Sequence, residues 1–416
     1  MFLLMLPLVP VSAQAGTQEP PCPEREPAGT LYVRGVNCRV VEIDGYPRRY
    51  IVYVPTNPVF NLEDDMPVVF MHHGTGGDDE KFLRISGWAE KAEQVGLVAV
   101  FPTGLVYLVF GETFCDGATC VLEPPRHKTK WNEYGLASKV DLNDKPPGYP
   151  DSGPWPADDI KFVRTMVGDL EASGLNIDPG RRYVSGFSNG AAFCMRVAVE
   201  LSDLFAAAGC SAGGLPGVYT PVRKIPVYLT VGNVDPGVVE VLNAEDNPNP
   251  PLTAVPLTYD ELFAYLFIQT SVGWLLDTFV VSHEPDAVFE EPNELRVEYR
   301  TPADPSVGQA KFFFAMQKGV THQFPNTRNN PEGFNNADRF WDFFSGLSPS
   351  GTAPTPSRMP TSFFQNPIFI GIILAAAAIT AAATGLWLRT KGRTRSSPNS
   401  VALMTSAKVA MFGART

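Results

Sequence analysis

Residues Gly186-Phe187-Ser188-Asn189-Gly190 carry the most information in this sequence. They follow the short apolar run Tyr183-Val184-Ser185 and precede a helix-like stretch, residues 191–201. The pattern predicts a strand, a sharp turn and a helix, with Ser188 at the apex of the turn. Glycines on both sides suit a strained, tightly packed turn, because a side chain at either place would clash. This arrangement favours an exposed, nucleophilic serine over an inert serine in a small-residue turn.

A serine hydroxyl needs a base that accepts its proton and a carboxylate that orients the base. In chains with such a turn, the acid and then the base follow the serine in sequence. Of the five histidines, only His283 and His322 come after Ser188. We favour His322, because it lies in a loop just after the predicted strand 311–315 and could hang over the carboxyl edge of a sheet.

The carboxylate is expected to follow the predicted strand 226–231, because catalytic groups collect at the carboxyl ends of parallel strands. Asp235 lies at that place, in a short loop before Pro236. Glu240 and Asp246 are further along the chain and less anchored. An aspartate before proline is also an ordinary turn residue, which is the alternative to a catalytic Asp235.

A developing oxyanion needs N–H donors close to the serine. One is predicted to be the backbone N–H of Asn189, which follows the serine and starts a helix. The other is expected in a loop after an early strand, and His72-His73-Gly74-Thr75-Gly76-Gly77 occupies such a place. We assign the Thr75 amide, with Gly74 or Gly76 as alternatives.

Two other kinds of site are disfavoured. No third histidine or cysteine lies near the His72-His73 pair at a spacing that zinc requires, and the acidic run 78–80 is expected to start a helix rather than to bind calcium. The formal net charge is −11, and the body of the chain has no cluster of Lys and Arg. Nucleic-acid binding needs basic patches, so the sequence predicts neither a metal nor a nucleic acid as partner.

Strand-like and helix-like segments alternate along the chain, which predicts an α/β fold with a mostly parallel sheet and helices on both faces. Apolar residues recur at helical spacing in residues 158–173, where Asp158 or Asp159 would cap the helix. The expected strands are 31–33, 39–43, 49–54, 67–71, 97–101, 183–185, 205–210, 226–231 and 311–315, and the expected helices are 80–94, 158–173, 191–201 and 336–344.

Both ends of the chain carry patterns typical of membrane topology. Residues 1–15 predict a signal peptide, although a basic start is lacking, and residues 366–388 predict a transmembrane helix. The tail 389–416 begins with several basic residues and is therefore expected in the cytoplasm, with the domain 20–347 outside the cell. A Pro/Ser/Thr-rich linker, residues 348–365, joins the two. An uncleaved anchor at the start and a buried soluble helix near the end are the alternatives.

Residues 236–292 are predicted to be an insertion, either a lid over the site or a peripheral helix. Six cysteines suit an exported protein, with buried free thiols as the alternative to bridges. A bridge between Cys194 and Cys210 is geometrically reasonable, because a helix and the strand that follows it are neighbours. The other cysteines are Cys115 and Cys120, which could pair locally, and Cys22 and Cys38, which bracket the first extended segment.

Several segments of residues 30–345 resemble the polyhydroxybutyrate depolymerase / feruloyl esterase family of α/β-hydrolases. The stretch 158–210 is the most specific of them. The matching residues are 158–163, 176–178, 183–190, 203–207, His73-Gly74, Phe101-Pro102-Thr103-Gly104, Trp131-Asn132 and His322-x-Phe324-Pro325.

The resemblance implies an α/β-hydrolase fold and an extracellular serine esterase without a cofactor. Its substrates would be polyesters of the hydroxyalkanoate type, or feruloyl and acetyl esters of polysaccharides. Phe187 and Trp155 are candidate walls of the substrate pocket, although either could be ordinary core. The rival functions are a serine peptidase of the same fold and a surface-anchored binding protein that has lost catalysis.

Overall fold

The computed structural model describes residues 22–111, 113–116, 119–122, 124–279, 282–300 and 311–347. The predicted signal peptide, linker, transmembrane helix and cytoplasmic tail all lie outside these residues. Within the described ranges, no helix combines the length and the apolar character needed to cross a membrane.

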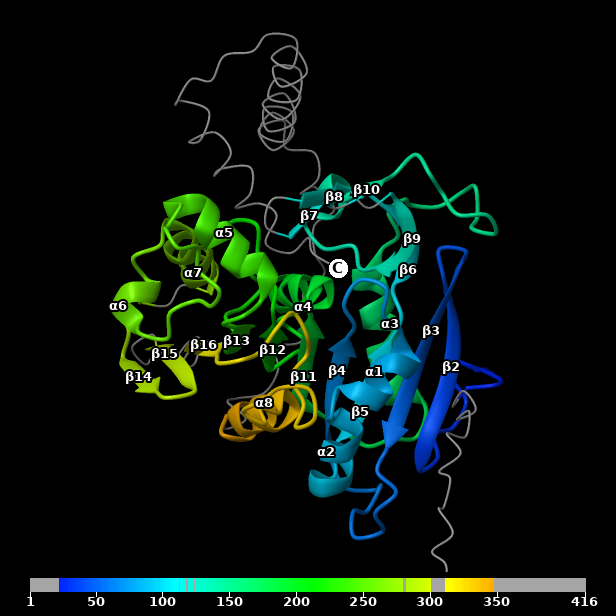
Figure 1. Ribbon diagram of the computed structural model, residues 1–416. Helices are drawn as coiled ribbons and strands as arrows, with labels where there is room; N and C mark the ends of the chain where they lie inside the picture. Colours follow the sequence, from blue (N-terminus) through cyan, green and yellow to red (C-terminus); the bar gives the residue numbers. More distant parts are fainter. Residues whose placement is uncertain are drawn as a thin grey trace, which may run out of the picture.

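A large twisted sheet forms the centre of the fold (Figure 1). The six strands β5, β4, β11, β12, β13 and β16 in the middle of the sheet run parallel to one another, whereas both flanks contain antiparallel pairs. The mostly parallel sheet is therefore confirmed. In order across the sheet, the strands are β1 (Glu26–Pro27), β2 (Gly35–Ile43), β3 (Tyr46–Val54), β5 (Val98–Pro102), β4 (Met66–His72), β11 (Ile177–Phe187), β12 (Ala207–Ser211), β13 (Val227–Gly232), β16 (Lys311–Gln317), β15 (Glu294–Arg300) and β14 (Ala287–Glu291).

Helices cover both faces of the sheet, as predicted. Side chains alternate along a strand, so Val68 and Phe70 of β4 pack into one apolar cluster while Val69 and Met71 pack into another on the opposite face. The first cluster is completed by α3 (Asp159–Ala172), α4 (Asn189–Glu200), α5 (Pro236–Asp246), α6 (Tyr259–Leu262) and α7 (Leu266–Phe279). The second is completed by α1 (Asp79–Ile85), α2 (Trp88–Val95) and α8 (Asn336–Ser345).

Two expectations about local structure are wrong. Residues 31–33 do not form a strand: Leu31 and Val33 are 70% and 63% exposed, and the Tyr32 hydroxyl donates a hydrogen bond to the buried Asp169 carboxylate. The helix expected over 80–94 is split into α1 and α2, because Gly87 takes a left-handed conformation with φ of 78°. Asp158, rather than Asp159, caps α3 through its bond from the Lys161 N–H.

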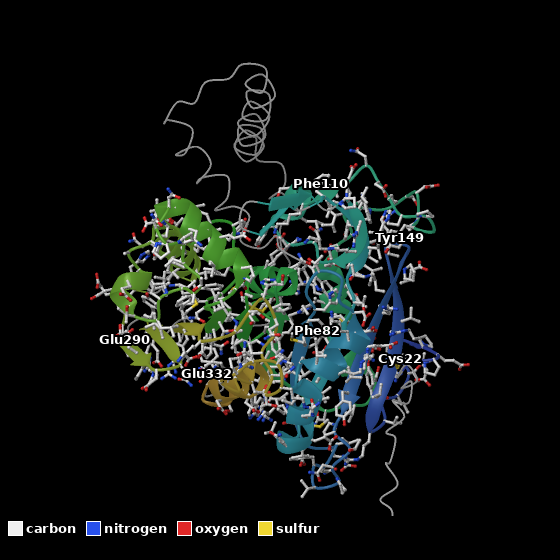
Figure 2. The ribbon with its side chains drawn as sticks, in the orientation of Figure 1. Cys22, Phe82, Phe110, Tyr149, Glu290 and Glu332 are labelled. Carbon is white, nitrogen blue, oxygen red and sulfur yellow. A yellow bond between two sulfur atoms is a disulfide. The ribbon has the colours of Figure 1, made fainter. Side chains whose placement is uncertain are left out.

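A second, small sheet is formed by residues that come between β5 and α3 in the chain. It has no counterpart among the predicted elements. Its order is β10 (Val140–Asp141), β6 (Leu105–Val109) and β9 (Arg126–Lys130), with a separate hairpin of β7 (Thr113–Asp116) and β8 (Thr119–Leu122) and a short 3₁₀ helix, Leu136–Ser138. Figures 1 and 2 show it at the top of the molecule, where Phe110 and Tyr149 are labelled. The sequence of β9, Arg-His-Lys-Thr-Lys, contains no apolar residue, so periodicity gave no signal for a strand.

The predicted insertion, residues 236–292, holds α5, α6, α7 and β14. Phe267, Val272 and Leu275 of α7 lie in the same buried cluster as Phe312 and Phe314 of β16. These contacts make the segment part of the hydrophobic core beside the sheet. The choice between a lid over the site and a peripheral helix stays a prediction.

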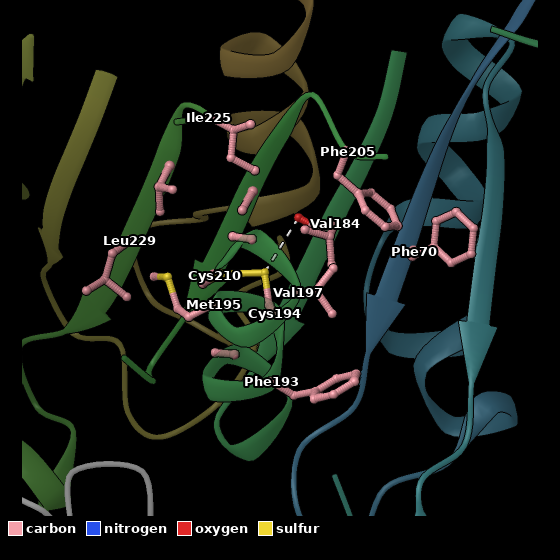
Figure 3. Packing of buried hydrophobic residues seen from close by; sticks show 14 of the residues in the cluster. Phe70, Val184, Phe193, Cys194, Met195, Val197, Phe205, Cys210, Ile225 and Leu229 are labelled. Atoms are coloured by element: carbon pink, nitrogen blue, oxygen red, sulfur yellow. Dashed lines mark hydrogen bonds between the residues drawn. A yellow bond between two sulfur atoms is a disulfide. The ribbon is translucent and has the colours of Figure 1, made fainter. Parts of the chain in front are cut away.

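Disulfides join Cys194 to Cys210 and Cys22 to Cys38. The first of them links α4 to the adjacent strand β12 inside the core (Figure 3), where both cysteines are fully buried. Cys115 and Cys120 face each other across the β7–β8 hairpin, but their side chains lie outside the described part of the structure.

Removing the Cys194–Cys210 bridge is expected to lower the free energy of unfolding by about 3 kcal/mol, the loop-closure term for a bridge that spans 16 residues. The Cys194→Ala/Cys210→Ala double variant tests this in urea unfolding. Cys22→Ala/Cys38→Ala is the comparison, since its bridge also spans 16 residues and loop closure predicts the same loss. A loss below about 1 kcal/mol in the first variant would contradict the expectation.

Candidate active site

Ser188 lies on a strained turn between β11 and α4. Its backbone dihedrals are φ 55° and ψ −120°, in the region that ordinary residues avoid. A Cβ on Gly186 would lie 2.1 Å from the Gly190 oxygen, and a Cβ on Gly190 would lie 2.3 Å from the carbonyl oxygens of His72 and His73. Both glycines are therefore required by close backbone approach, as the motif predicts.

The structure brings the three predicted catalytic side chains together in a hydrogen-bonded series. The Ser188 hydroxyl Oγ lies 2.9 Å from His322 Nε2, and His322 Nδ1 lies 2.7 Å from Asp235 Oδ2. The Asp235 side chain is 2% exposed and the His322 side chain is 16% exposed. This geometry lets the imidazole take a proton from the serine while the carboxylate holds its other nitrogen.

Ser188 itself is only 1% exposed, which differs from the exposed serine that the sequence predicts. The His322 imidazole covers one side of the hydroxyl. The loop at Gly74 covers another, since a Cβ added there would be 3.3 Å from the Ser188 Cβ.

Local contacts hold the acid and the base next to each other. Asp235 caps α5 with Oδ1, which accepts the Gly237 N–H at 2.9 Å and leaves Oδ2 for His322. The loop that carries His322 is joined to the loop before Asp235, because Asn233 Oδ1 accepts the Gly319 N–H at 2.8 Å. Sequence reasoning missed this role of Asn233, since a single asparagine after a strand gives no signal for its partner.

The alternative residues are placed elsewhere. His283 is exposed and pairs with Asp277 at 2.8 Å. Glu240 and Asp246 lie within α5, beyond the capping aspartate that contacts His322.

Two backbone amides near Ser188 are available to an oxyanion. The Gly76 N–H donates to the Thr129 carbonyl at 2.9 Å, which removes Gly76 from the alternatives. Among the described residues, no acceptor contacts the N–H of Thr75 or of Asn189. The N–H groups of Thr75 and Asn189, which the sequence predicts as donors, are thus unengaged. Gly74 stays the alternative to Thr75, because no acceptor contacts its N–H among the described residues.

His72 and His73 are structural. His72 Nδ1 lies 3.2 Å from the Ser185 carbonyl and His73 Nδ1 lies 2.6 Å from the Gly74 carbonyl. The Gly104 N–H donates to His73 Nε2 at 2.9 Å, so Nδ1 carries the proton on this ring. Burial lowers the pKa of His72 to about 3 and that of His73 to about 4. In the described part of the chain, no three His, Cys, Asp or Glu side chains cluster in a way that could hold a metal.

The pKa values of these two histidines predict acid sensitivity. Between pH 6.5 and about 4 the unfolded chain binds protons that the folded chain excludes, so stability is lost as the pH falls through this window. Two histidines give a slope of at most about 2.7 kcal/mol per pH unit, measurable by urea unfolding at pH 7, 6 and 5. His72→Asn keeps a donor for the Ser185 carbonyl and should halve the slope.

His127→Asn is the control for that experiment. His127 is exposed and pairs with Asp144 on the surface, so this variant removes a histidine without changing either buried ring. Equal slopes in the parent chain and in His72→Asn would show that these buried rings do not cause the acid sensitivity.

The two predicted pocket residues have different places. The ring centroid of Phe187 is 5.1 Å from that of His322 and 6.3 Å from that of Phe82, which Figure 2 labels. Phe187 thus lies beside the His322 imidazole. Trp155 instead packs on Tyr107 at 4.7 Å, and its indole donates to the Leu142 carbonyl, in the separate cluster under the small sheet. The structure does not bring Trp155 together with Phe187.

No family model matches the chain. The chain is similar in sequence to a curated protein, "Putative esterase NocK" of Nocardia uniformis subsp. tsuyamanensis. The two are 29% identical over 202 residues, which make up 48% of this chain and 48% of NocK. The chain resembles an esterase of the α/β-hydrolase type. It spans about half the length of the curated relative that it matches, so its activity and substrates are matters for proposal.

Solved structures give weaker likenesses. An acetyl xylan esterase from Aspergillus awamori is 14% identical, with 72% of this chain and 94% of that chain covered and a TM-score of 0.40. A CE1 ferulic acid esterase from Anaeromyces mucronatus is 11% identical, with 76% and 91% covered and a TM-score of 0.36. The fold is instead defined by the strand order of the large sheet and by the turn at Ser188.

Proposed function

We propose that this chain is a serine esterase that hydrolyses carboxylic esters through an acyl-enzyme. The observation that carries the proposal is the series from Asp235 through His322 to Ser188, placed on a strained turn beside two unengaged amides. Acyl transfer requires these parts: an activated hydroxyl, a base, a group that orients the base, and donors for the oxyanion.

The first half of the reaction forms the acyl-enzyme. Ser188 Oγ attacks the ester carbonyl carbon and its proton passes to His322 Nε2, while the carbonyl electron pair moves onto oxygen. The Thr75 and Asn189 amides donate to this oxyanion. When the intermediate collapses, the bond to the alcohol oxygen breaks and His322 gives its proton to that oxygen.

The second half repeats these steps with water. His322 accepts a proton from the water, whose oxygen attacks the acyl carbon, and then returns the proton to Ser188 as the acid leaves. Asp235 stabilises the charged imidazole in both halves, and no step needs a metal or cofactor.

The proposed substrates are esters of the hydroxyalkanoate, feruloyl or acetyl type. A polymeric ester is a substrate only if its chain can reach Ser188. A panel separates them: methyl ferulate, acetylated xylan, oligomers of 3-hydroxybutyrate and p-nitrophenyl acetate, each offered to the purified full chain. Hydrolysis of at least one, together with fluorophosphonate labelling of the peptide that contains Ser188, is the expected result.

The same panel, extended by a p-nitroanilide amide, tests the rival functions. A serine peptidase would hydrolyse a p-nitroanilide amide faster than the matching ester. A binding protein that has lost catalysis would hydrolyse nothing and would not react with the fluorophosphonate. Either outcome would overturn the proposal.

We further propose that the domain acts outside the cell, held at the membrane by residues 366–388 with the tail 389–416 in the cytoplasm. The disulfides Cys22–Cys38 and Cys194–Cys210 support export, because such bridges persist in oxidising compartments. Protease added to intact cells should remove the domain and leave the tail protected. Protection of the domain would contradict the proposal.

A further inference from the structure

The segment Thr129-Lys130-Trp131, at the end of β9, is the part of the small sheet that reaches the candidate oxyanion hole. The two proposed donors come from different parts of the chain: Thr75 from the loop after β4, and Asn189 from the turn after β11. Both the loop that carries Thr75 and the side chain of Asn189 are hydrogen-bonded to this one segment. The function proposed above assigns the segment no role.

The first side of the segment holds the loop around Thr75. The Gly76 N–H donates to the Thr129 carbonyl at 2.9 Å, and the Thr129 hydroxyl donates to the Gly77 carbonyl at 2.6 Å. The Lys130 ammonium donates to the Thr75 hydroxyl at 2.9 Å. Three consecutive loop residues are therefore fixed, while the Thr75 amide stays unengaged.

The second side holds Asn189 by its side chain. The Trp131 N–H donates to Asn189 Oδ1 at 2.7 Å, and Asn189 Nδ2 donates back to the Trp131 carbonyl at 3.3 Å. The Trp131 indole donates to the His73 carbonyl at 2.9 Å, which joins this side to the start of the loop.

The segment is itself immobilised. Trp131 is fully buried, and its ring stacks on Phe193 of α4 with centroids 5.0 Å apart and planes 10° apart. A Cβ on Gly104 would lie 2.5 Å from the Lys130 carbonyl oxygen, so another stretch of backbone presses directly on the segment.

We propose that residues 129–131 set the distance between the two oxyanion donors, with Trp131 and the Asn189 side chain as positioning groups. This inference depends on the function proposed above. Donors stabilise an oxyanion only when they already point at its place, and errors of about 1 Å cost about 100-fold in rate. A single segment that is bonded both to the loop of Thr75 and to the Asn189 side chain meets this requirement.

Trp131→Phe tests the proposal, because it removes the indole N–H but keeps an aromatic ring against Phe193. The expected result is a kcat lower by about tenfold to 100-fold with KM changed less than about twofold. The inhibition constant of an alkyl boronic acid, whose tetrahedral adduct on Ser188 uses the oxyanion hole, should rise by the same factor. Asn189→Ala, which keeps its backbone N–H, should give the same pattern.

Trp88→Phe is the matched control. Trp88 is also fully buried, but its indole nitrogen has no hydrogen-bond partner in the described part of the chain, so the same substitution removes no positioning bond. Its kcat and boronic acid inhibition should equal those of the parent chain.

The outcomes separate the two proposals. A parent chain that hydrolyses no ester and binds no boronic acid would overturn the function itself. An active parent chain whose Trp131→Phe and Asn189→Ala variants keep kcat and boronic acid affinity would overturn the positioning role alone. A lowered melting temperature with unchanged kcat would likewise show that Trp131 serves only stability.

Discussion

Ser188→Ala is expected to lower kcat for ester hydrolysis by about 10⁵- to 10⁶-fold. The reason is the short contact between Ser188 Oγ and His322 Nε2, which provides the one activated hydroxyl at the strained turn. Without it no acyl-enzyme can form, and the oxyanion donors alone leave a weak residual rate. The measurement is the rate of p-nitrophenyl ester hydrolysis by the purified chain, together with the loss of fluorophosphonate labelling.

Ser185→Ala is the matched control, because Ser185 lies on β11, three residues before Ser188, and is also buried. Its hydroxyl has no partner among the described residues, so the loss of that hydroxyl should leave the rate unchanged. Full activity in Ser188→Ala would remove the serine from the mechanism, whatever the geometry around it.

The turn at Ser188 could be predicted from sequence because close backbone contacts in the turn require glycine at two positions. Gly186 and Gly190 each face a carbonyl oxygen at a distance that no side chain could share. His322 and Asp235 followed from chain order and from strands that are easily recognised, since β13 and β16 are apolar and buried. Such strands show as short, continuous apolar runs bounded by turn residues, rather than as a periodic pattern.

The surroundings of the site could not be predicted in the same way. The strand β9 carries basic residues in place of an apolar pattern, so β9 was not predicted, and neither was the contact that occupies the Gly76 amide. Its neighbour β6, Leu-Val-Tyr-Leu-Val, is an apolar run that was also not assigned to a strand. Trp155 lies close to the active-site segments in sequence but packs into the cluster under that sheet. Which tryptophan meets the oxyanion loop depends on long-range packing, which single-sequence patterns do not record.

Asp235→Asn should lower kcat by about 10⁴-fold. Asp235 Oδ2 accepts from His322 Nδ1 at 2.7 Å, which fixes the imidazole so that Nε2 faces Ser188. An amide NH₂ at that place would donate to Nδ1 instead, so the imidazole would carry its proton on Nε2. A protonated Nε2 cannot accept the proton of Ser188. Steady-state kinetics on a p-nitrophenyl ester measure the loss.

Asp246→Asn is the control, since Asp246 was the more distant candidate and is an exposed residue at the end of α5. Its kinetics should match those of the parent chain. A loss of activity in this variant, with Asp235→Asn still active, would transfer the role of the acid to another carboxylate.

Stability distinguishes catalysis from folding in this experiment. Asp235 also caps α5 through Oδ1, which accepts the Gly237 N–H at 2.9 Å. Asparagine caps helices about as well as aspartate, so Asp235→Asn should keep the helix start and shift the free energy of unfolding by less than about 1 kcal/mol. A large fall in kcat at nearly constant stability would therefore come from the lost orientation of His322, because the same substitution leaves the helix cap in place.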